Sequence, residues 1–392
     1  MALELTIEGC LPTDWRQATL VGRAWLPGQN AGPAIVTVRG DALVDITGTM
    51  ATMSDLMNAE DPLALARSAP GEEIGSLAEI LANSAHDAQD PQRPSLLAPN
   101  DLQAIKAAGV TFAVSMLERV IEEQAKGDPK AADEIRGTIS ESIGTDLSEI
   151  VPGSEGAERL KALLIERGLW SQYLEVGIGP EAEVFTKSQP MSAVGVGAEV
   201  GVTEKSTWNN PEPEVVVVVN ARGEITGATL GNDVNLRDVE GRSALLLGKA
   251  KDNNGSAAVG PLIRLLDDSF TLDDLRDADL TMTVEGTDGY ILNGVSSMKL
   301  ISRDPTDLVA QTIGGHHQYP DGFVLMTGTA FAPTKDRDAP GLGFTHHTGD
   351  VVSIHSPKFG TLVNRVGLAN QIPPWTFGTG ALMRNLAARG LL

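Results

Sequence analysis

Cysteine, long apolar runs and a basic leader are scarce or absent in this sequence of 392 residues. The single cysteine, Cys10, excludes an intramolecular disulfide framework and fits a reducing compartment. No apolar run approaches the roughly 18 residues that a membrane-spanning helix needs, and no Lys- or Arg-flanked apolar segment opens the chain. We therefore expect a soluble, cytoplasmic protein that does not insert into a membrane.

Positive charge is also in short supply. The chain has 30 Lys and Arg residues against 52 Asp and Glu residues, which gives a formal net charge of −22. An acidic surface of this kind repels other polyanions, so we expect neither nucleic acid nor an anionic membrane as a partner. The hydrophobic content of 42% fits an ordinary globular core.

Several common catalytic signatures are missing. The chain has no glycine-rich loop of the P-loop or dinucleotide type and no G-x-S-x-G elbow, which argues against nucleotide-dependent enzymes and serine hydrolases. Two histidine pairs, His316-His317 and His346-His347, have no thiolate cluster beside them, and adjacent histidines in a strand point to opposite faces. Zinc is therefore disfavoured, while a contact between one histidine and a substrate hydroxyl stays open.

The length predicts two domains, because a single core rarely grows beyond about 250–300 residues. We expect a small N-terminal α/β domain over residues 1–95 and a catalytic domain over residues 96–392, joined by a linker rich in Pro, Asp and Gln at 87–100. A polar, helix-rich insertion is expected at about 128–173. Local patterns further predict strands at 22–25, 34–38 and through 280–366, and helices at 53–57 and 77–83.

A β-hairpin is predicted near the middle of the chain. Residues 215–219 are a run of valines that ends at the turn signal Asn220-Ala221-Arg222-Gly223, and a second strand-like segment covers residues 224–230. If Asn220 pairs with Gly223 across the turn, Asp233 lies opposite Asn210. Side chains alternate between the two faces of a strand, so this register defines which residues share a face.

Three carboxylates converge in this arrangement, because Glu212, Glu214 and Asp233 then lie on one face beside Asn210. Such a cluster needs a compensating cation, and all-oxygen ligands favour Mg²⁺, with Mn²⁺ or Ca²⁺ as alternatives. Three protein ligands also leave coordination positions open for a chelating substrate. The alternative is a solvated acidic face, and a register slip of one residue moves Asp233 to the other face.

These residues, with others in the same order, resemble the fumarylacetoacetate hydrolase family over roughly residues 100 to 366. The family folds as a mixed β-roll, so the resemblance implies an α+β protein with this catalytic domain, which usually forms homodimers or homotetramers. The motifs that carry the resemblance are Phe185-x-Lys187, Glu212-x-Glu214, Asp233, Arg237-Asp238, Lys249-Ala250-Lys251, Thr327-Gly328-Thr329, Gly349-Asp350-Val351-Val352 and Gly360-Thr361-Leu362-x-Asn364.

The resemblance assigns roles to residues. Glu212, Glu214 and Asp233 are implied to hold the metal, and the Gly328 amide with the Thr329 hydroxyl to hold the carboxylate of the substrate. Further expectations concern three cations: Lys187 is either near the site or an exposed strand-end charge, Lys251 orients substrate or acts as a base if positive neighbours depress its pKa, and Arg237 forms a structural ion pair with Asp238.

One helix departs from the family pattern. Family hydrolases tend to show Asn-Tyr-x-x-His-x-x-Glu, and this chain has Thr111-Phe112-x-x-Ser115-x-x-Glu118. Without the histidine, no His–Glu dyad can activate water, which disfavours hydrolysis of a carbon–carbon bond. Ser115 either hydrogen-bonds a substrate hydroxyl or a water, or belongs to a solvated helix face. The loop after Thr329 also has Ala330 where the family usually has proline.

With this departure from the hydrolase pattern, the chain most resembles the sugar-acid dehydratases of the family. The expected substrate is a small 2-oxo sugar acid, 2-keto-3-deoxy-D-xylonate/D-arabinonate, and the expected product is 2,5-dioxopentanoate. In this hypothesis Lys251 takes the C3 proton or steadies the enolate, and Glu118, through water and Ser115, protonates the leaving C4 hydroxyl. The alternatives are an acylpyruvate or fumarylacetoacetate-type hydrolase that uses Glu118 alone, and a non-enzymatic acidic metal-binding protein on the family fold.

Overall fold

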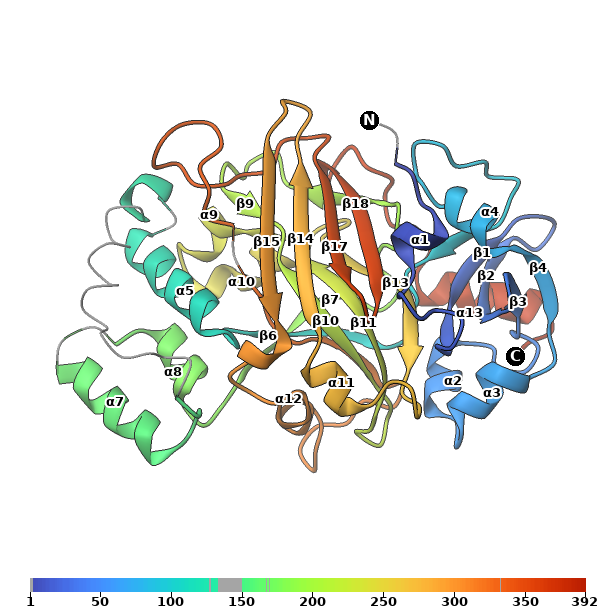
Figure 1. Ribbon diagram of the computed structural model, residues 1–392, viewed down its shortest axis with the longest axis horizontal. Helices are drawn as coiled ribbons and strands as arrows, with labels where there is room; N and C mark the ends of the chain where they lie inside the picture. The colour runs from blue at the N-terminus through green and yellow to red at the C-terminus, as the bar shows by residue number, and fades with distance from the viewer. Residues whose placement is uncertain (1–2, 127, 133–149, 167, 169, 332) are drawn as a thin grey trace.

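The computed structural model describes residues 3–126, 128–132, 150–166, 168, 170–331 and 333–392 (Figure 1). The predicted insertion at 128–173 therefore lies partly outside the described residues. Within them, no helix is both long and apolar enough to cross a membrane.

Two large β-sheets dominate the described part of the chain (Figure 1). One has 11 strands in the order β4-β3-β2-β1-β13-β11-β10-β16-β6-β7, with β5 beside β1. These strands are β1 (Leu20–Leu26), β2 (Gly32–Arg39), β3 (Ala42–Asp45), β4 (Glu72–Ser76), β5 (Ser95–Leu97), β6 (Ala104–Gly109), β7 (Glu183–Ser188), β10 (Pro213–Val219), β11 (Ile225–Asp233), β13 (Ala257–Leu265) and β16 (Phe323–Met326).

The second large sheet has 5 strands in the order β15-β14-β17-β18-β8, and a short 2-stranded sheet pairs β12 with β9. Most pairs are antiparallel, but β16 runs parallel to β6 and β18 runs parallel to β8, so the fold is mixed. These strands are β8 (Glu199–Val202), β9 (Asn209–Asn210), β12 (Asn235–Leu236), β14 (Asp279–Glu285), β15 (Ile291–Ser297), β17 (Val351–Ser356) and β18 (Gly360–Leu368).

Helices gather at the two ends of this β structure (Figure 1). At the end that holds the N-terminal strands lie α1 (Ile7–Cys10), α2 (Met53–Asn58), α3 (Pro62–Ser68), α4 (Leu77–Ala82) and α13 (Thr379–Ala388). At the other end lie α5 (Ala113–Ala125), α7 (Glu155–Glu166), α8 (Gln172–Ile178), α9 (Arg237–Glu240) and α10 (Leu247–Lys251), while η2 (Ala244–Leu246), α11 (Leu272–Arg276), η3 (Met298–Leu300) and α12 (Pro305–Thr312) connect strands.

The valine run of β10 is buried on both faces. Val215, Val217 and Val219 pack in the core shared with the 5-stranded sheet, while Val216 and Val218 pack in a second core with α2. A strand covered on both sides has no polar face, which explains a run of valines without alternation. The predicted strand at 215–219 is confirmed, as are the strands at 22–25 and 34–38 and the helices at 53–57 and 77–83.

The predicted hairpin is present, but its register differs from the prediction by two residues. β10 and β11 pair Pro213 with Asn232 and Glu214 with Gly231, and the register shifts at a bulge between Val218 and Val219. The expected pairing of Asp233 with Asn210 is therefore wrong. Because the side-chain period is two, a shift of two residues leaves every side chain on its predicted face.

Asp233 instead lies beside Glu212, since the backbone N–H of Asp233 donates to the Glu212 carbonyl at 3.0 Å. Asn210 pairs with Asn235 in the next rung, between β9 and β12. The carboxylates of Glu212 and Asp233 are thereby nearest neighbours across the hairpin.

The N-terminal strands continue the large sheet. β1 pairs with β13, with Leu20 opposite Arg264, and β5 pairs farther along the same edge of β1, opposite β2, within the segment expected as a linker. Asp101, which follows that segment, accepts hydrogen bonds from the backbone N–H groups of Met53 and Ser54 at 2.6 and 3.1 Å. The chain before β6 is thus tied to the first turn of α2.

Candidate metal centre and active site

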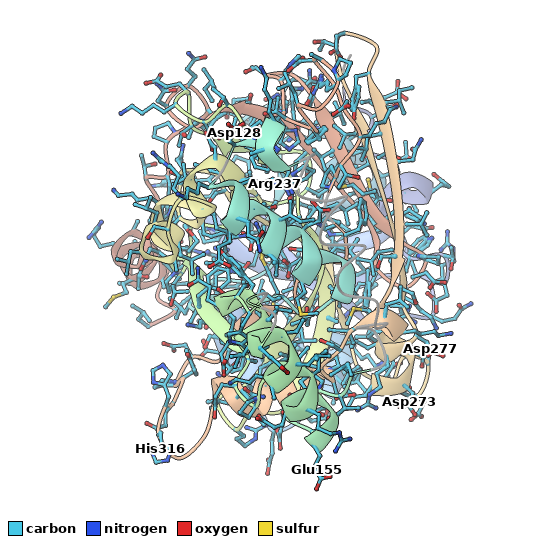
Figure 2. All side chains as sticks on the ribbon, turned by 90° about the vertical axis from the view of Figure 1, so that its left-hand side faces the viewer. Asp128, Glu155, Arg237, Asp273, Asp277 and His316 are labelled. Carbon is cyan, nitrogen blue, oxygen red and sulfur yellow. The ribbon has the colours of Figure 1, made fainter. Side chains whose placement is uncertain are left out.

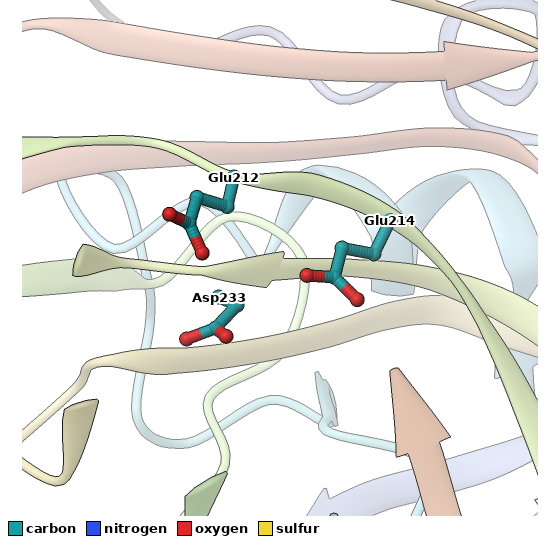
Figure 3. Close-up of side chains that lie close together, drawn as sticks. All are labelled: Glu212, Glu214 and Asp233. Atoms are coloured by element: carbon teal, nitrogen blue, oxygen red, sulfur yellow. The ribbon is translucent and has the colours of Figure 1, made fainter. Parts of the chain in front are cut away.

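Glu212, Glu214 and Asp233 meet on the face of the β10–β11 hairpin (Figure 3). One carboxylate oxygen from each lies within 4.8 Å of the other two, and each residue is at most 2% exposed. Among the described residues this is the only group of three or more His, Cys, Asp or Glu side chains close enough to share a metal ion. The structure thus brings the three predicted ligands together, and all three offer oxygen atoms.

Three buried cations lie against two of these carboxylates. Lys251 Nζ is 2.5 Å from Glu212 Oε2 and 3.0 Å from Asp233 Oδ2. Lys187 Nζ is 2.7 Å from Asp233 Oδ1, and it also donates to the carbonyls of Val234 and Lys251. The guanidinium of Arg119 contacts Glu212. Lys187 is therefore part of the site and is not an exposed strand-end charge.

Glu214 has no such neighbour. Within the described chain it makes no ion pair, and it accepts a hydrogen bond from the backbone N–H of Gly328, with Gly328 N at 2.6 Å from Glu214 Oε2. Burial, followed by the charges of Asp233 and Glu212, raises the pKa of Glu214 well above its ordinary value. A divalent cation among oxygen donors would supply the missing positive charge, so the residues present fit a hard metal ion.

The ionisation of the neighbours follows from the same charges. Burial opposes ionisation of Glu212, but Arg119 and Lys251 outweigh it and lower the pKa of Glu212 to about 2. Burial alone would also lower the pKa of Lys251, yet the charges of Asp233 and Glu212 raise it above the ordinary lysine value. The protein's own charges therefore favour the ammonium form, and a depressed Lys251 pKa, which depends on a bound metal ion, stays a prediction. For Lys187 burial prevails and lowers the pKa.

Arg119 is the centre of a buried charge network that the sequence patterns did not reveal. Its Nη1 lies 2.7 Å from Glu122 and 2.6 Å from Glu240, and its Nη2 contacts Glu212. Arg119 directly follows Glu118 in α5, so the two side chains leave the helix in different directions. It is Arg119 that reaches the Glu212 carboxylate, whereas Glu118 contacts Arg237. Arg119 thereby links α5, α9 and the β10–β11 hairpin.

Glu118 and Arg237 form a neighbouring part of the same network. Arg237 Nη2 is 3.3 Å from Glu118 Oε2 and 2.5 Å from Glu122 Oε1, and the guanidinium lies over the Trp208 ring at 4.5 Å. The predicted pair of Arg237 with Asp238 is therefore wrong. Asp238 instead accepts hydrogen bonds from Ser206 Oγ and the Thr207 amide. Ser115 lies in α5, but its side chain is outside the described part of the structure.

Glu183 is a second residue that the sequence analysis missed. It lines the small cavity at the carboxylates, as do Phe185 and Lys251. Burial, followed by the charge of Glu240, raises the pKa of Glu183 to about 7. Strand alternation could have identified it, because Glu183 lies four residues before Lys187 in β7 and shares its face.

The loop after β16 closes another side of the site. Gly328 has φ +110°, and a Cβ there would lie 1.8 Å from Thr111 Oγ1, so only glycine fits. The Gly328 amide, which we expected on a substrate carboxylate, is bound to Glu214. Thr329 is 7% exposed and lines the same small cavity.

The histidine pairs lie apart from the carboxylates. His346 is buried, with Nδ1 at 3.2 Å from Asp350 Oδ2, and burial lowers its pKa. His347 pairs with Asp288 and Asp338. His317 belongs to a tight turn, where its backbone pairs with Gly314 and its ring meets the Tyr319 ring in an edge-to-face contact.

Comparison with known proteins connects this geometry to a family. Residues 176–367 match the family model described as fumarylacetoacetate (FAA) hydrolase C-terminal. A solved structure of 2-keto-3-deoxy-D-arabinonate dehydratase, complexed with magnesium and 2,5-dioxopentanoate, has a TM-score of 0.62 at 20% identity, covering 89% of this chain and 99% of that one. A fumarylacetoacetate hydrolase from Exiguobacterium antarcticum has a TM-score of 0.54 at 15% identity, covering 89% and 99%. The resemblance is confirmed, and the chain has the fumarylacetoacetate hydrolase fold.

Two proteins with assigned names match about half of this chain at 32% identity. A probable 2-keto-3-deoxyxylonate dehydratase of Haloferax volcanii is 32% identical over 201 residues, which is 51% of this chain and 65% of that protein. A 2-dehydro-3-deoxy-D-arabinonate dehydratase of Saccharolobus solfataricus is 32% identical over 187 residues, 47% of this chain and 58% of that protein. The match covers less than two thirds of the length of either relative.

Proposed function

We propose that the chain is a metal-dependent hydro-lyase that converts a 2-keto-3-deoxy sugar acid, 2-keto-3-deoxy-D-xylonate/D-arabinonate, to 2,5-dioxopentanoate. The observation that carries the proposal is the buried triad of Glu212, Glu214 and Asp233 with Lys251 between two of its members. The similarity to two proteins named as dehydratases of such acids supports this choice of substrate class.

The three carboxylates would hold Mg²⁺, or the similar oxygen-preferring ions Mn²⁺ and Ca²⁺. When bound, such an ion polarises the keto and carboxylate oxygens of a 2-oxo acid and acidifies its C3 protons. In the dehydration, C3 loses a proton, the C4–O bond breaks and the hydroxyl leaves as water. Tautomerisation of the remaining unsaturated acid then gives 2,5-dioxopentanoate.

Lys251 is placed to steady negative charge. Its ammonium group is held by Glu212 and Asp233 in a buried site, where a fixed positive charge acts strongly on charge that develops nearby. The raised pKa of Lys251 keeps this group charged. We therefore assign it to stabilising the enolate in preference to removing the C3 proton.

Glu183 replaces Glu118 in our assignment of the proton donor. Glu183 lines the cavity with Lys251 and Thr329 and has a pKa of about 7, so near neutral pH it can carry the proton that the leaving C4 hydroxyl needs. Glu118 is engaged by Arg237, which also donates to the Pro333 carbonyl at 3.1 Å. Glu118 then positions the loop that follows Thr329.

A panel of substrates tests the reaction class. The full chain with Mg²⁺ is incubated with 2-keto-3-deoxy-D-xylonate, with its L-epimer at C4 and with acetylpyruvate, and the products are identified by mass spectrometry. Formation of 2,5-dioxopentanoate that stops with EDTA supports the proposal. Cleavage of acetylpyruvate without dehydration of either sugar acid would replace it with the hydrolase alternative.

A further inference from the structure

A second cavity, separate from the metal centre, is lined by a cluster of cations. It has a volume of about 590 Å³ and lies beside α9 and α10, at the end of the molecule that faces the viewer in Figure 2. Asp128, labelled in that view, is part of its wall. Four cationic side chains line it: Lys126, Lys205, Arg242 and Lys249.

These four side chains make no ion pair and no side-chain hydrogen bond with any residue that the structure describes. The two acidic residues of the wall are engaged elsewhere: Asp238 accepts from Ser206 and Thr207, and Asp128 accepts from the Lys130 amide. In a chain with 52 acidic against 30 basic side chains, cations readily find carboxylate partners. These neutral donors leave both carboxylates charged, so four cations and two anions give the lining a net charge of +2 (4 − 2), a local positive potential in an acidic chain.

Lys126 is held in an unusual conformation. It follows the last turn of α5 with φ 53°, in the left-handed region that favours glycine. Its backbone N–H still caps the helix by donating to the Glu122 and Glu123 carbonyls. The helix end thus carries a lysine in a strained position at the rim of the cavity.

We propose that this cavity binds a small polyanion that carries a phosphate or at least two carboxylates. Its volume lies within the range of small-molecule pockets. Leu236, Val239 and Leu246 supply apolar wall for a carbon skeleton, and the four cations supply the charge. An acidic surface elsewhere on the chain keeps larger polyanions away, which favours a small ligand.

Two helices, α9 and α10, contribute residues both to this cavity and to the candidate metal centre. In α10, Lys249 lines the cation-rich cavity, and Lys251, on the opposite side of the helix, contacts Glu212 and Asp233. In α9, Val239 lines the cavity and Glu240 contacts Arg119. An occupant therefore touches the same two helices that position groups of the metal centre.

Titration calorimetry on the full chain with Mg²⁺ tests the proposal, with inorganic phosphate and succinate as separate probes. We expect saturable binding of at least one probe, weakened about tenfold or more in the double variant K205Q/K249Q because two attractive charges are lost. The control K299Q/R384Q has the same change in net charge at exposed residues outside the cavity. We expect the control to bind as the unaltered chain does.

A metal-centre variant, Glu214→Gln, separates this cavity from the active site and should keep the binding. The proposal is overturned by three results: no saturable binding of either probe, equal weakening in K205Q/K249Q and K299Q/R384Q, or binding that Glu214→Gln abolishes and K205Q/K249Q retains. Phosphate binding without succinate binding selects the phosphate-bearing class, and the reverse selects the dicarboxylates.

Discussion

The backbone N–H of Gly328 donates to Oε2 of Glu214 at 2.6 Å, and this bond joins the loop after β16 to the β10–β11 hairpin that carries the carboxylates. Glu214 is the one triad member without a buried cation beside it in the described structure, whereas Glu212 and Asp233 both contact Lys251. The geometry thus divides the triad into two compensated carboxylates and one that a metal ion would neutralise.

Replacing Glu214 by Gln should therefore separate metal binding from stability. We expect Mg²⁺ affinity, measured by calorimetry, to fall at least about tenfold. In EDTA, the thermal midpoint should stay equal or rise, because the ionised carboxylate is disfavoured at this buried position and glutamine can still accept from Gly328. Glu224→Gln, an exposed change of equal charge, serves as control. Unchanged Mg²⁺ affinity would remove Glu214 from the ligand set.

Glycine at position 328 should be essential to the loop. In Gly328→Ala the new Cβ would lie 1.8 Å from Thr111 Oγ1 at a φ of +110°, so the loop must move away from Glu214. We expect unfolding in urea to show a loss of about 2 kcal/mol or more. Gly248→Ala, which meets no atom within 4 Å, should change stability little. Equal effects of the two substitutions would contradict this account.

Arg119 should contribute strongly to folding stability. Arg119→Met leaves Glu122, Glu212 and Glu240 without their shared partner, and removing one member of a buried charge network typically costs about 3 kcal/mol or more. Urea unfolding measures the loss, and Arg384→Met at an exposed position is the matched control. A stability equal to that of the control would show that the network contributes little.

Glu183 should give the protein a pH dependence near neutrality. Its pKa is raised to about 7 in the folded state, so between its unfolded value and pH 7 the folded chain binds the extra proton. Stability should then fall as pH rises through this window, by at most about 3 kcal/mol, and level off above it.

The protonation state of Glu183 should also control the rate of turnover. If Glu183 protonates the leaving hydroxyl, activity falls as pH rises through about 7. Glu183→Gln should lose most of the turnover and also the slope of stability against pH, while Glu181→Gln, an exposed neighbour, should keep both. A pH profile of stability that Glu183→Gln leaves intact would reject the raised pKa.

The sequence predicted the hairpin and the face of its carboxylates because strand alternation and β-branched runs are local properties. It missed the register because two shifts of one residue add up: at the turn Asn220 pairs with Glu224 in place of Gly223, and at the bulge opposite Val218 and Val219 the extra residue is Thr226 of β11. The error did not affect the triad, since a shift of two preserves the faces.

Other residues of the site depend on packing between distant segments. Arg119 meets Glu212 and Glu240 only because of how α5 lies against the sheet, and no spacing in the sequence encodes that contact. Glu183 and Lys187 are four residues apart in β7, so strand alternation alone would have placed both on one face of that strand. The roles of the site residues and the domain boundary near residue 95 stay predictions.

The most direct test of the account is exchange of the C3 protons of 2-keto-3-deoxy-D-xylonate in D₂O, followed by NMR together with the appearance of 2,5-dioxopentanoate. The account predicts that both processes require Mg²⁺, stop with EDTA and are lost in Glu214→Gln. Exchange and product formation that continue at an unchanged rate in EDTA would contradict the central claim that the carboxylate triad holds the catalytic metal ion.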